Sequence, residues 1–108
     1  MSALTREQRR YLRTLAQRLH LKDSVQVGKL GVTGPVIEAV NVSLEAHELI
    51  KVRFIAFKDE KDPLVADITE GTQSELVALT GHVALLYRQH PDPDKRVVEL
   101  PERGPGMR

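Results

Sequence analysis

The chain has 108 residues, a formal net charge of +1, 41% hydrophobic residues and no cysteine. A chain of this length can bury one hydrophobic core without disulfides or a structural metal, so we expect a single domain over residues 1–101 followed by a loose tail, 102–108. The lack of cysteine excludes disulfides, thiol catalysis and thiolate metal sites and favours a protein of the cytoplasm, and no apolar run is long enough to span a membrane.

Basic residues are concentrated in the first third of the chain. Residues 1–31 hold seven Lys or Arg against two acidic residues, whereas the remainder holds nine against thirteen. A chain polarised in this way can present a positive field on one face while it stays nearly neutral overall. The distribution predicts an anionic partner, although a solvated charged helix has the same composition.

The first predicted helix covers residues 5–19. Thr5 can cap it, and Gln8 three residues later completes a capping box. At about 100° per residue, one side of the helix is apolar and comprises Leu4, Gln8, Tyr11, Leu12, Leu15, Ala16 and Leu19. The other side is an arginine stripe that comprises Arg6, Arg9, Arg10 and Arg13. Because like charges on neighbouring turns repel, folding does not require this stripe, and we expect it to face the anionic partner.

A short strand, a glycine-flanked loop and a second helix follow. SVQV (24–27) predicts a strand at the centre of a sheet, and GKLG (28–31) follows it directly. Thr33 is the expected N-cap of a helix over about 34–46, whose first turn tolerates Pro35 because amides there have no helical partner. The side chains expected on its buried side are Val36, Ile37, Val40 and Leu44.

The segment LIKVRFIAF (49–57) alternates between apolar and basic residues, which predicts a strand with one core face and one wet or partner-facing side. The core face comprises Ile50, Val52 and Phe54, and the other face carries Lys51 and Arg53.

The remaining elements are a helix and a hairpin. We expect a third helix over about 63–73, capped by Asp62, begun by Pro63 and ended by Gly71. ELVAL and HVALLYR predict two strands around Thr80-Gly81, and RVVEL (96–100) is a candidate short edge strand. The order αβαβαββ predicts an α/β two-layer sandwich, with a four-stranded mixed sheet, three helices, right-handed crossovers and one sheet face partly open.

The GKLG loop has several possible interpretations. Its glycine spacing fits neither a Walker A loop nor a dinucleotide-binding fingerprint. A tight strand-to-helix turn explains the glycines alone. A backbone clamp for nucleic acid also explains Lys29, because unpaired amides at a helix N-terminus attract phosphate and glycine lets it approach closely. KH domains grip single-stranded RNA with a G-x-x-G loop in this way.

Three segments together resemble the YhbY family, the bacterial stand-alone form of the CRM domain (chloroplast RNA splicing and ribosome maturation). They are VQVGKLGVT (25–33), EAHELIKVRF (45–54) and LLYR (85–88), and the similarity runs from about Leu4 to Pro101. The resemblance implies a fold similar to the C-terminal domain of translation initiation factor three. It also implies RNA binding and, in bacteria, association with precursors of the large (50S) ribosomal subunit. The family positions that it assigns to RNA contact or to basic side chains are Gly28, Lys29, Leu30, Gly31, Lys51 and Arg88.

We therefore expect a non-catalytic, monomeric RNA-binding protein of the cytoplasm that binds ribosomal RNA and assists 50S subunit assembly, without cofactor, metal or membrane. The loop and the arginine stripe are expected on the same side of the molecule. The residues expected to contact RNA are Gly28, Lys29, Leu30, Gly31, Thr33, Lys22, Arg6, Arg9, Arg10, Arg13, Lys51, Arg53 and Arg88.

Enzyme chemistry has little support in the sequence. The four histidines lack metal-ligand spacing, and there is no G-x-S-x-G nucleophile elbow. The pair His47-Glu48 could act as acid and base, but a surface or capping role is commoner at a helix-to-strand junction. DEKD (59–62) could hold a cation, but such a run is typical of a solvated turn.

Other binding modes remain as alternatives. Base stacking of the RRM type needs exposed sheet aromatics, and of the four aromatic residues Phe54 and Tyr11 are expected in the core. We therefore expect recognition through phosphates and RNA shape, with little single-base readout. The acidic remainder of the chain could instead meet a basic ribosomal protein, which would make the domain a protein-interaction module without direct RNA contact. DNA binding is less favoured, since no helix-turn-helix is apparent.

Overall fold

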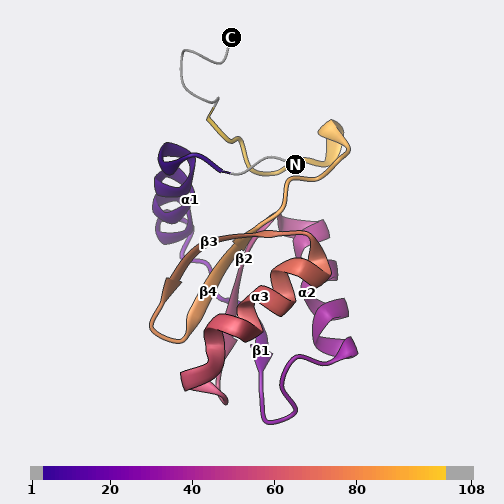
Figure 1. Cartoon of the computed structure of the whole chain (residues 1–108). Helices are drawn as coiled ribbons and strands as arrows, with labels where there is room; N and C mark the ends of the chain where they lie inside the picture. The colour runs from indigo at the N-terminus through magenta and orange to yellow at the C-terminus, as the bar shows by residue number, and fades with distance from the viewer. Residues whose placement is uncertain (1–3, 102–108) are drawn as a thin grey trace.

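The computed structural model describes residues 4–101, except for the side chain of Lys58; the tail expected at 102–108 lies outside the described residues. The elements follow one another in the expected order (Figure 1). They are α1 (Arg6–Arg18), β1 (Asp23–Val27), α2 (Gly34–His47), β2 (Leu49–Phe54), α3 (Lys61–Thr72), β3 (Glu75–Thr80) and β4 (Val83–Tyr87). There are also two 3-10 turns: η1 (Lys58–Glu60) precedes α3, and η2 (Pro93–Lys95) follows β4.

The strands form one mixed sheet in the order β1-β2-β4-β3. β1 is parallel to β2, and β4 is antiparallel to both β2 and β3. The predicted four-stranded mixed sheet with three helices is therefore confirmed. The central position expected for β1 is wrong, because β4 lies between β2 and β3 and leaves β1 at an edge with a single neighbour.

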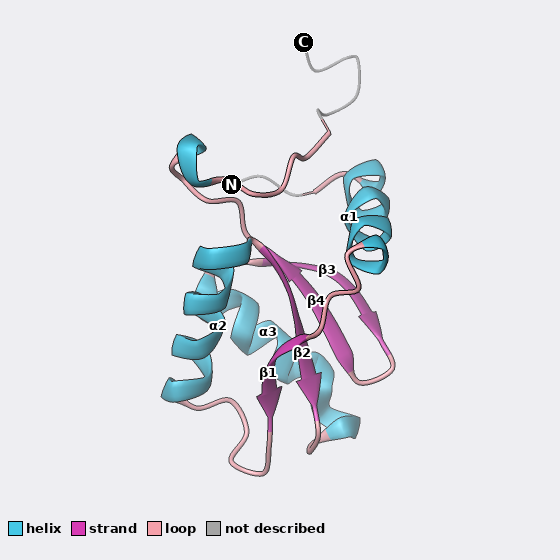
Figure 2. Ribbon diagram, turned by 180° about the vertical axis from the view of Figure 1, so that it is seen from behind, coloured by secondary structure: helices cyan, strands magenta, loops and turns pink. Residues whose placement is uncertain are grey.

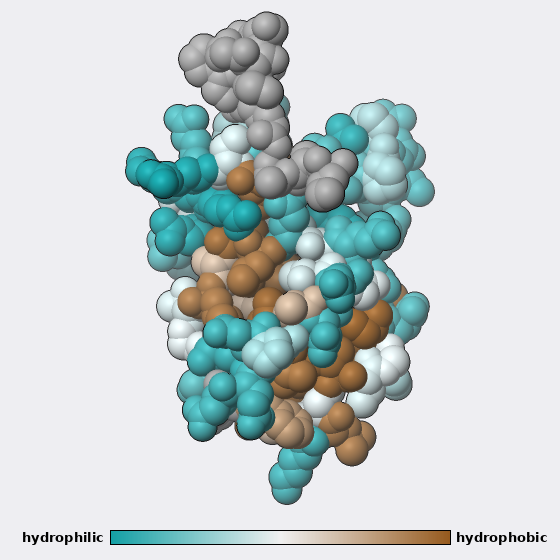
Figure 3. All heavy atoms as spheres, in the orientation of Figure 1, coloured by the Kyte–Doolittle hydropathy of each residue, from teal (hydrophilic) through white to brown (hydrophobic). Residues whose placement is uncertain are grey.

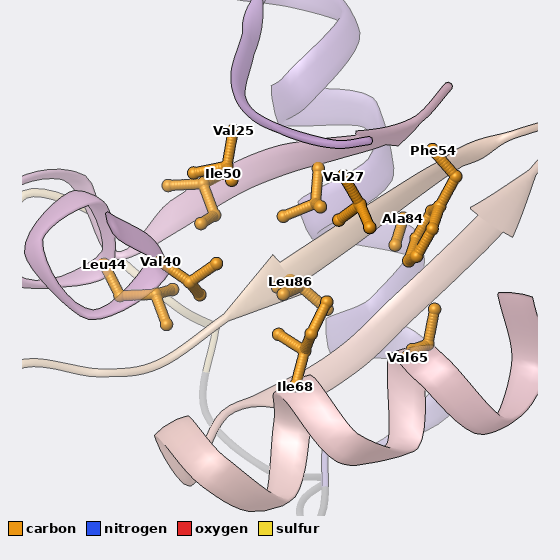
Figure 4. Close-up of a cluster of buried hydrophobic side chains, with 11 residues drawn as sticks. Val25, Val27, Val40, Leu44, Ile50, Phe54, Val65, Ile68, Ala84 and Leu86 are labelled. Carbon is orange, nitrogen blue, oxygen red and sulfur yellow. The ribbon is translucent and has the colours of Figure 1, made fainter. Parts of the chain in front are cut away.

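Helices α2 and α3 cover one face of the sheet, and the main hydrophobic core lies between them and the strands (Figure 4). Its most buried side chains include Phe54 from β2, Leu86 from β4, Ile68 from α3 and Leu44 from α2. The alternation of β2 is therefore as predicted, with its apolar face toward these helices. Burial of this kind contributes about 25 cal/mol per Å² of apolar surface, and it is the main stabilising term of the domain.

Helix α1 does not join this helical layer but packs on the opposite face of the sheet, over β3 and β4 (Figure 2). Leu12 and Ala16 meet Leu85, Tyr87 and other side chains there in a second buried cluster. The same sheet face is left uncovered over β1 and β2, where Gln26 and Arg53 are exposed. The expectation of a partly open sheet face is confirmed, and the open part is the β1–β2 half.

The predicted N-caps of α1 and α2 are both present. Thr5 and Gln8 form the capping box of α1, and Thr33 accepts the amide of Val36 at the start of α2. Gln8 has a second role: its carboxamide donates to the carbonyl of Pro101 at 2.8 Å. The side chain thus joins the start of α1 to the end of the described chain. Leu19, expected on the buried side, is 57% exposed at the C-cap.

Three boundaries differ from the prediction. β2 ends at Phe54 rather than at residue 57, and α3 begins at Lys61, not at the expected Asp62–Pro63 cap. Pro63 is tolerated inside the first turn of α3, where amides need no helical acceptor. Gly71 does not end this helix, which closes at Gln73 in the left-handed region with φ of 56°.

The segment 96–100 is not the edge strand that was expected. The amides of Val97 and Val98 donate to the carboxylate of Glu48 at 2.8 and 2.7 Å, so they are not available to a sheet. Glu48 is the C-cap of α2, with φ of 64°, and is fully buried. A capping role for the His47-Glu48 pair is thus confirmed for Glu48. None of the helices that the structure describes has the length and apolar character needed to cross a bilayer.

Candidate nucleic-acid interface

The GKLG loop connects the end of β1 to the start of α2, beyond the end of the sheet (Figure 2). The amide of Gly31 donates to the carbonyl of Gly28 at 3.0 Å, which closes a turn. Gly31 has φ of +75°, a conformation that favours glycine. The tight-turn interpretation therefore accounts for Gly31, and one of the loop amides is bonded internally.

The other loop amides are free. Within residues 4–101, the amides of Lys29, Leu30 and Val32 have no hydrogen-bond acceptor. The side chain of Lys29 is exposed and has no partner in the same part of the chain. Thr33 caps α2 just after the loop, so the positive end of the helix dipole lies beside these amides. Together the free amides, the cation and the helix end form a site suited to an oxyanion such as phosphate.

Exposed apolar side chains surround this loop. A Cβ atom at Gly28 would lie 3.9 Å from Cδ1 of Ile55, and one at Gly31 would lie 3.7 Å from Cε2 of Phe57. Leu30, at the tip of the loop, is 89% exposed, Ile55 53% and Phe57 41%. Figure 3 shows apolar surface at this end of the molecule, beside a protruding hydrophilic side chain. We call Leu30, Ile55 and Phe57 the apolar trio.

Ile55 and Phe57 were not among the residues predicted to contact RNA. The strand predicted there runs to residue 57, whereas both residues follow the end of β2. The carboxyl ends of two neighbouring parallel strands lie at the same end of a sheet. β1 and β2 are such a pair. That pairing was the signal that could have placed residues 55–57 beside the loop.

The two basic residues of β2 lie on the open half of the sheet. Arg53 donates to Asp23 of β1 through Nε at 2.5 Å, and both side chains are partly exposed. Lys51 is half-buried beside Asp23 and has no partner among residues 4–101. Exposed ion pairs of this type contribute little to stability, so Arg53 can exchange its partner for another anion.

Lys22 and the arginine stripe lie away from the loop. Lys22 precedes β1, so it is about 17 Å from the loop along five strand residues. Arg9 donates to the carbonyl of Leu76 and lies 4.0 Å from Glu75, both on β3. β3 is the sheet edge opposite β1. The expectation that the stripe and the loop share one side is therefore wrong; α1 and the loop lie at opposite ends of the molecule (Figure 1).

The other arginines of the stripe are available. Arg6, Arg10 and Arg13 are exposed and have no ion-pair or hydrogen-bond partner within residues 4–101. They form a second basic patch over β3, separate from the loop. Across the sheet, β3 lies about 14 Å from β1, the strand that leads into the loop.

Arg88 is engaged inside the protein. Its guanidinium donates to the carbonyl of Thr72 at 2.7 Å, to Oδ1 of Asn41 at 2.8 Å and to Glu45 at 3.4 Å. It thereby ties the end of β4 to the middle of α2 and to the end of α3. A shallow groove of about 820 Å³ adjoins it and is also lined by Glu38 and Glu45. These carboxylates disfavour a phosphate there, so the structure accounts for Arg88 without a ligand.

The two faces of the sheet differ in charge. α1 carries five arginines and one acid, whereas α2 carries two acids and no Lys or Arg. The exposed side chains of α3 include Asp62, Asp67 and Glu70. A polyanion is therefore favoured on the α1 side and at the loop, and disfavoured over α2 and α3. No cluster of metal-ligating side chains occurs within the described part of the chain.

These features coincide with a known domain. A family model of the CRS1 / YhbY (CRM) domain matches residues 4–88. The chain belongs to the CRS1/YhbY family. The matched CRM region contains the loop, the apolar trio and both basic residues of β2.

Relatives of the CRM domain support this assignment. The chain is 34% identical to the Pseudomonas aeruginosa protein "Probable RNA-binding protein PA4753", over 91% of this chain and 93% of the relative. It is 35% identical to Bacillus subtilis "Probable RNA-binding protein YqeI", over 91% and 99%. The solution structure of SAV1595 from Staphylococcus aureus superposes with a TM-score of 0.73 at 36% identity, covering 92% of this chain and 100% of that one.

Proposed function

We propose that this CRM-domain protein binds RNA without catalysis, and that loop 28–31 and the start of α2 hold a phosphate of its backbone. The observation that carries the proposal is the set of free amides at Lys29, Leu30 and Val32 beside an exposed lysine. Relatives that align over most of the chain are named RNA-binding proteins, which supports the same ligand.

The partner that we propose is ribosomal RNA in a precursor of the large (50S) subunit, bound by a monomer in the cytoplasm. The resemblance to the YhbY family supports this choice. The protein would assist assembly by holding an RNA segment in place, since the site supplies positioning groups and a positive field. Lys51 and Arg53 would extend the contact over the open half of the sheet, and the arginines of α1 would bind a more distant part of the same RNA.

Fluorescence anisotropy with purified protein and labelled ribosomal RNA fragments tests the clamp. Gly31→Asp places a carboxylate at the phosphate site and strains a φ of +75°. Gly81→Asp is the matched control, because Gly81 has φ of +60° and open space around it, in the hairpin at the other sheet edge. Both variants should lose similar stability, but only Gly31→Asp should lose RNA affinity, by roughly tenfold or more.

Two results would count against the proposal. Equal affinity in the two glycine variants would reduce the loop to a structural turn. If the pure protein bound no RNA and reached ribosomal particles only through another protein, the interaction-module alternative would hold. The acidic surface of α2, with Glu38 and Glu45, is the feature that favours this alternative, since it could meet a basic ribosomal protein.

A further inference from the structure

Phe57 is the aromatic residue whose ring is most available to a ligand. The chain has four aromatic residues. Phe54 and Tyr87 are 1% and 3% exposed, and Tyr11 packs against the second cluster. Phe57 is 41% exposed and lies next to the GKLG loop, 3.7 Å from the Cβ position of Gly31. Its ring therefore adjoins the proposed phosphate site.

The backbone does not favour an aromatic side chain at this position. Phe57 has φ of 58° and ψ of 39°, the left-handed region that bulky residues rarely adopt. The carbonyl of Phe57 accepts the amide of Glu60 at 3.0 Å, which fixes this conformation at the start of η1. Neither burial nor backbone preference accounts for the ring, and such outliers are concentrated at ligand-binding sites.

The apolar trio and the free amides suit the two parts of one nucleotide. Three of the six large apolar side chains that are exposed in the described residues belong to the trio. The amides and Lys29 next to them attract an anion. A nucleotide carries a charged phosphate and a flat base on adjacent parts of the same unit, so it fits this combination better than an apolar protein surface does.

We propose that Phe57 stacks on an unpaired base of the RNA whose phosphate the GKLG loop holds. The inference rests on the RNA-binding function proposed above and specifies its ligand class as single-stranded RNA, such as a loop, a bulge or an end. Bases in a duplex are stacked on each other and do not present a free face, whereas splayed bases stack readily on aromatic side chains. Stacking tolerates every base, so it adds affinity without strong sequence preference.

The test uses a single-stranded RNA octamer that carries 2-aminopurine, whose fluorescence is quenched when the base stacks. Binding of the wild-type protein should quench the probe. Phe57→Leu should weaken binding roughly 5- to 150-fold, the range of base–aromatic stacking, and should abolish the additional quenching. The salt dependence of binding should stay the same, because no phosphate contact is removed. Phe57→Trp should retain both affinity and quenching.

Controls separate stacking from folding. Leu19→Ala removes another exposed apolar side chain, on the far side of the sheet, and should leave the affinity unchanged. Circular dichroism and thermal unfolding check that each variant is folded. A duplex of the same sequence should bind the wild-type protein more weakly than the single strand.

The outcomes distinguish this inference from the proposed function. If the wild-type protein binds the octamer but Phe57→Leu binds equally well, the stacking role is wrong while RNA binding stands. Equal affinity for duplex and single strand, or saturation of the wild-type protein without quenching, would also overturn the inference. A wild-type protein that binds neither RNA contradicts the proposed function itself, and the apolar trio is then a contact for another protein.

Discussion

The carboxylate of Glu48, a fully buried side chain, accepts a hydrogen bond from the backbone amide of His90 at 2.6 Å. The same carboxylate accepts the amides of Val97 and Val98. One acid at the end of α2 thus fixes the segment that follows β4. Because these amides are satisfied by a side chain, the segment crosses the end of the sheet without joining it.

Replacement of this acid should be strongly destabilising. Glu48→Ala leaves three amides without an acceptor in a mostly buried site, and each costs about 1–3 kcal/mol. We expect urea denaturation to show a loss of roughly 3 kcal/mol or more in the free energy of unfolding. Glu38→Ala is the control, since Glu38 is an exposed acid on α2 without an ion pair among residues 4–101, and its loss should change the free energy of unfolding by less than about 0.5 kcal/mol. A similar loss in both variants would contradict the role of Glu48.

Replacement of Arg88 should lower the stability of the fold, whereas replacement of Lys51 should lower the affinity for RNA. Arg88→Lys cannot reproduce the forked contacts to Asn41 and Thr72, so we expect a loss of roughly 1–3 kcal/mol in unfolding free energy. The folded variant should keep its RNA affinity. Lys51→Gln should show the reverse, with unchanged stability and weaker binding. Reduced RNA affinity in fully folded Arg88→Lys would place Arg88 in the interface after all.

The separation of the two basic patches predicts a dependence on RNA length. With a single-stranded trinucleotide, which is too short to reach from the loop to α1, Lys29→Gln should reduce the slope of log K against log salt by about 0.7, the value of one phosphate contact. Changing Arg6, Arg10 and Arg13 together to glutamine should leave that slope unchanged, because α1 lies across the sheet from the loop.

A longer ribosomal RNA fragment should respond to both sets of changes. The triple arginine variant should then lose about 2 units of slope for three phosphates. If binding of the trinucleotide already responds to the arginine changes, the two patches act as one site.

The raised pKa of Tyr87 predicts that the protein loses stability at alkaline pH. Burial raises the pKa of Tyr87 from 10.0 to about 12, and the negative charge of Glu48 adds to the rise. A raised pKa means that the folded state holds the proton more tightly than the unfolded state. The stabilisation is therefore complete below pH 10 and is lost as the pH rises through about 12.

Between pH 8 and pH 11 the loss from Tyr87 should be about 1.4 kcal/mol, one pKa unit of differential stabilisation. Tyr87→Phe keeps the packing but has no proton to lose. The stability of this variant should thus fall less over the same pH range, and the two unfolding curves, measured in urea at several pH values, should diverge by that amount. Parallel curves would show that Tyr87 ionises equally easily in both states.

The local elements could be predicted because their signals are local. Thr5 with Gln8, and Thr33 with Pro35, mark two helix starts that the structure contains. The end of β2 was missed, because the residues after Phe54 continue an apolar pattern while the chain has already left the sheet. Alternation reports which face a residue takes, but not where pairing with the neighbouring strand stops.

The site was predictable only in part. The loop followed from its glycines and from the cap at Thr33, since these depend on adjacent residues. The place of the arginine stripe depends on strand order, which the sequence pattern does not specify. α1 packs against β3, and β3 is the sheet edge opposite β1. Arg88 looked like a free cation because its acceptors, Asn41 and Thr72, are distant in sequence.

The bond between Gln8 and the carbonyl of Pro101 brings the two ends of the described chain together. Since β4 runs antiparallel to β2, that meeting point is at the end of the sheet away from the GKLG loop. Affinity tags, surface tethers or fluorescent fusions attached beyond either end should therefore leave the loop accessible. Immobilisation through the ends would orient every molecule with its loop toward the solution.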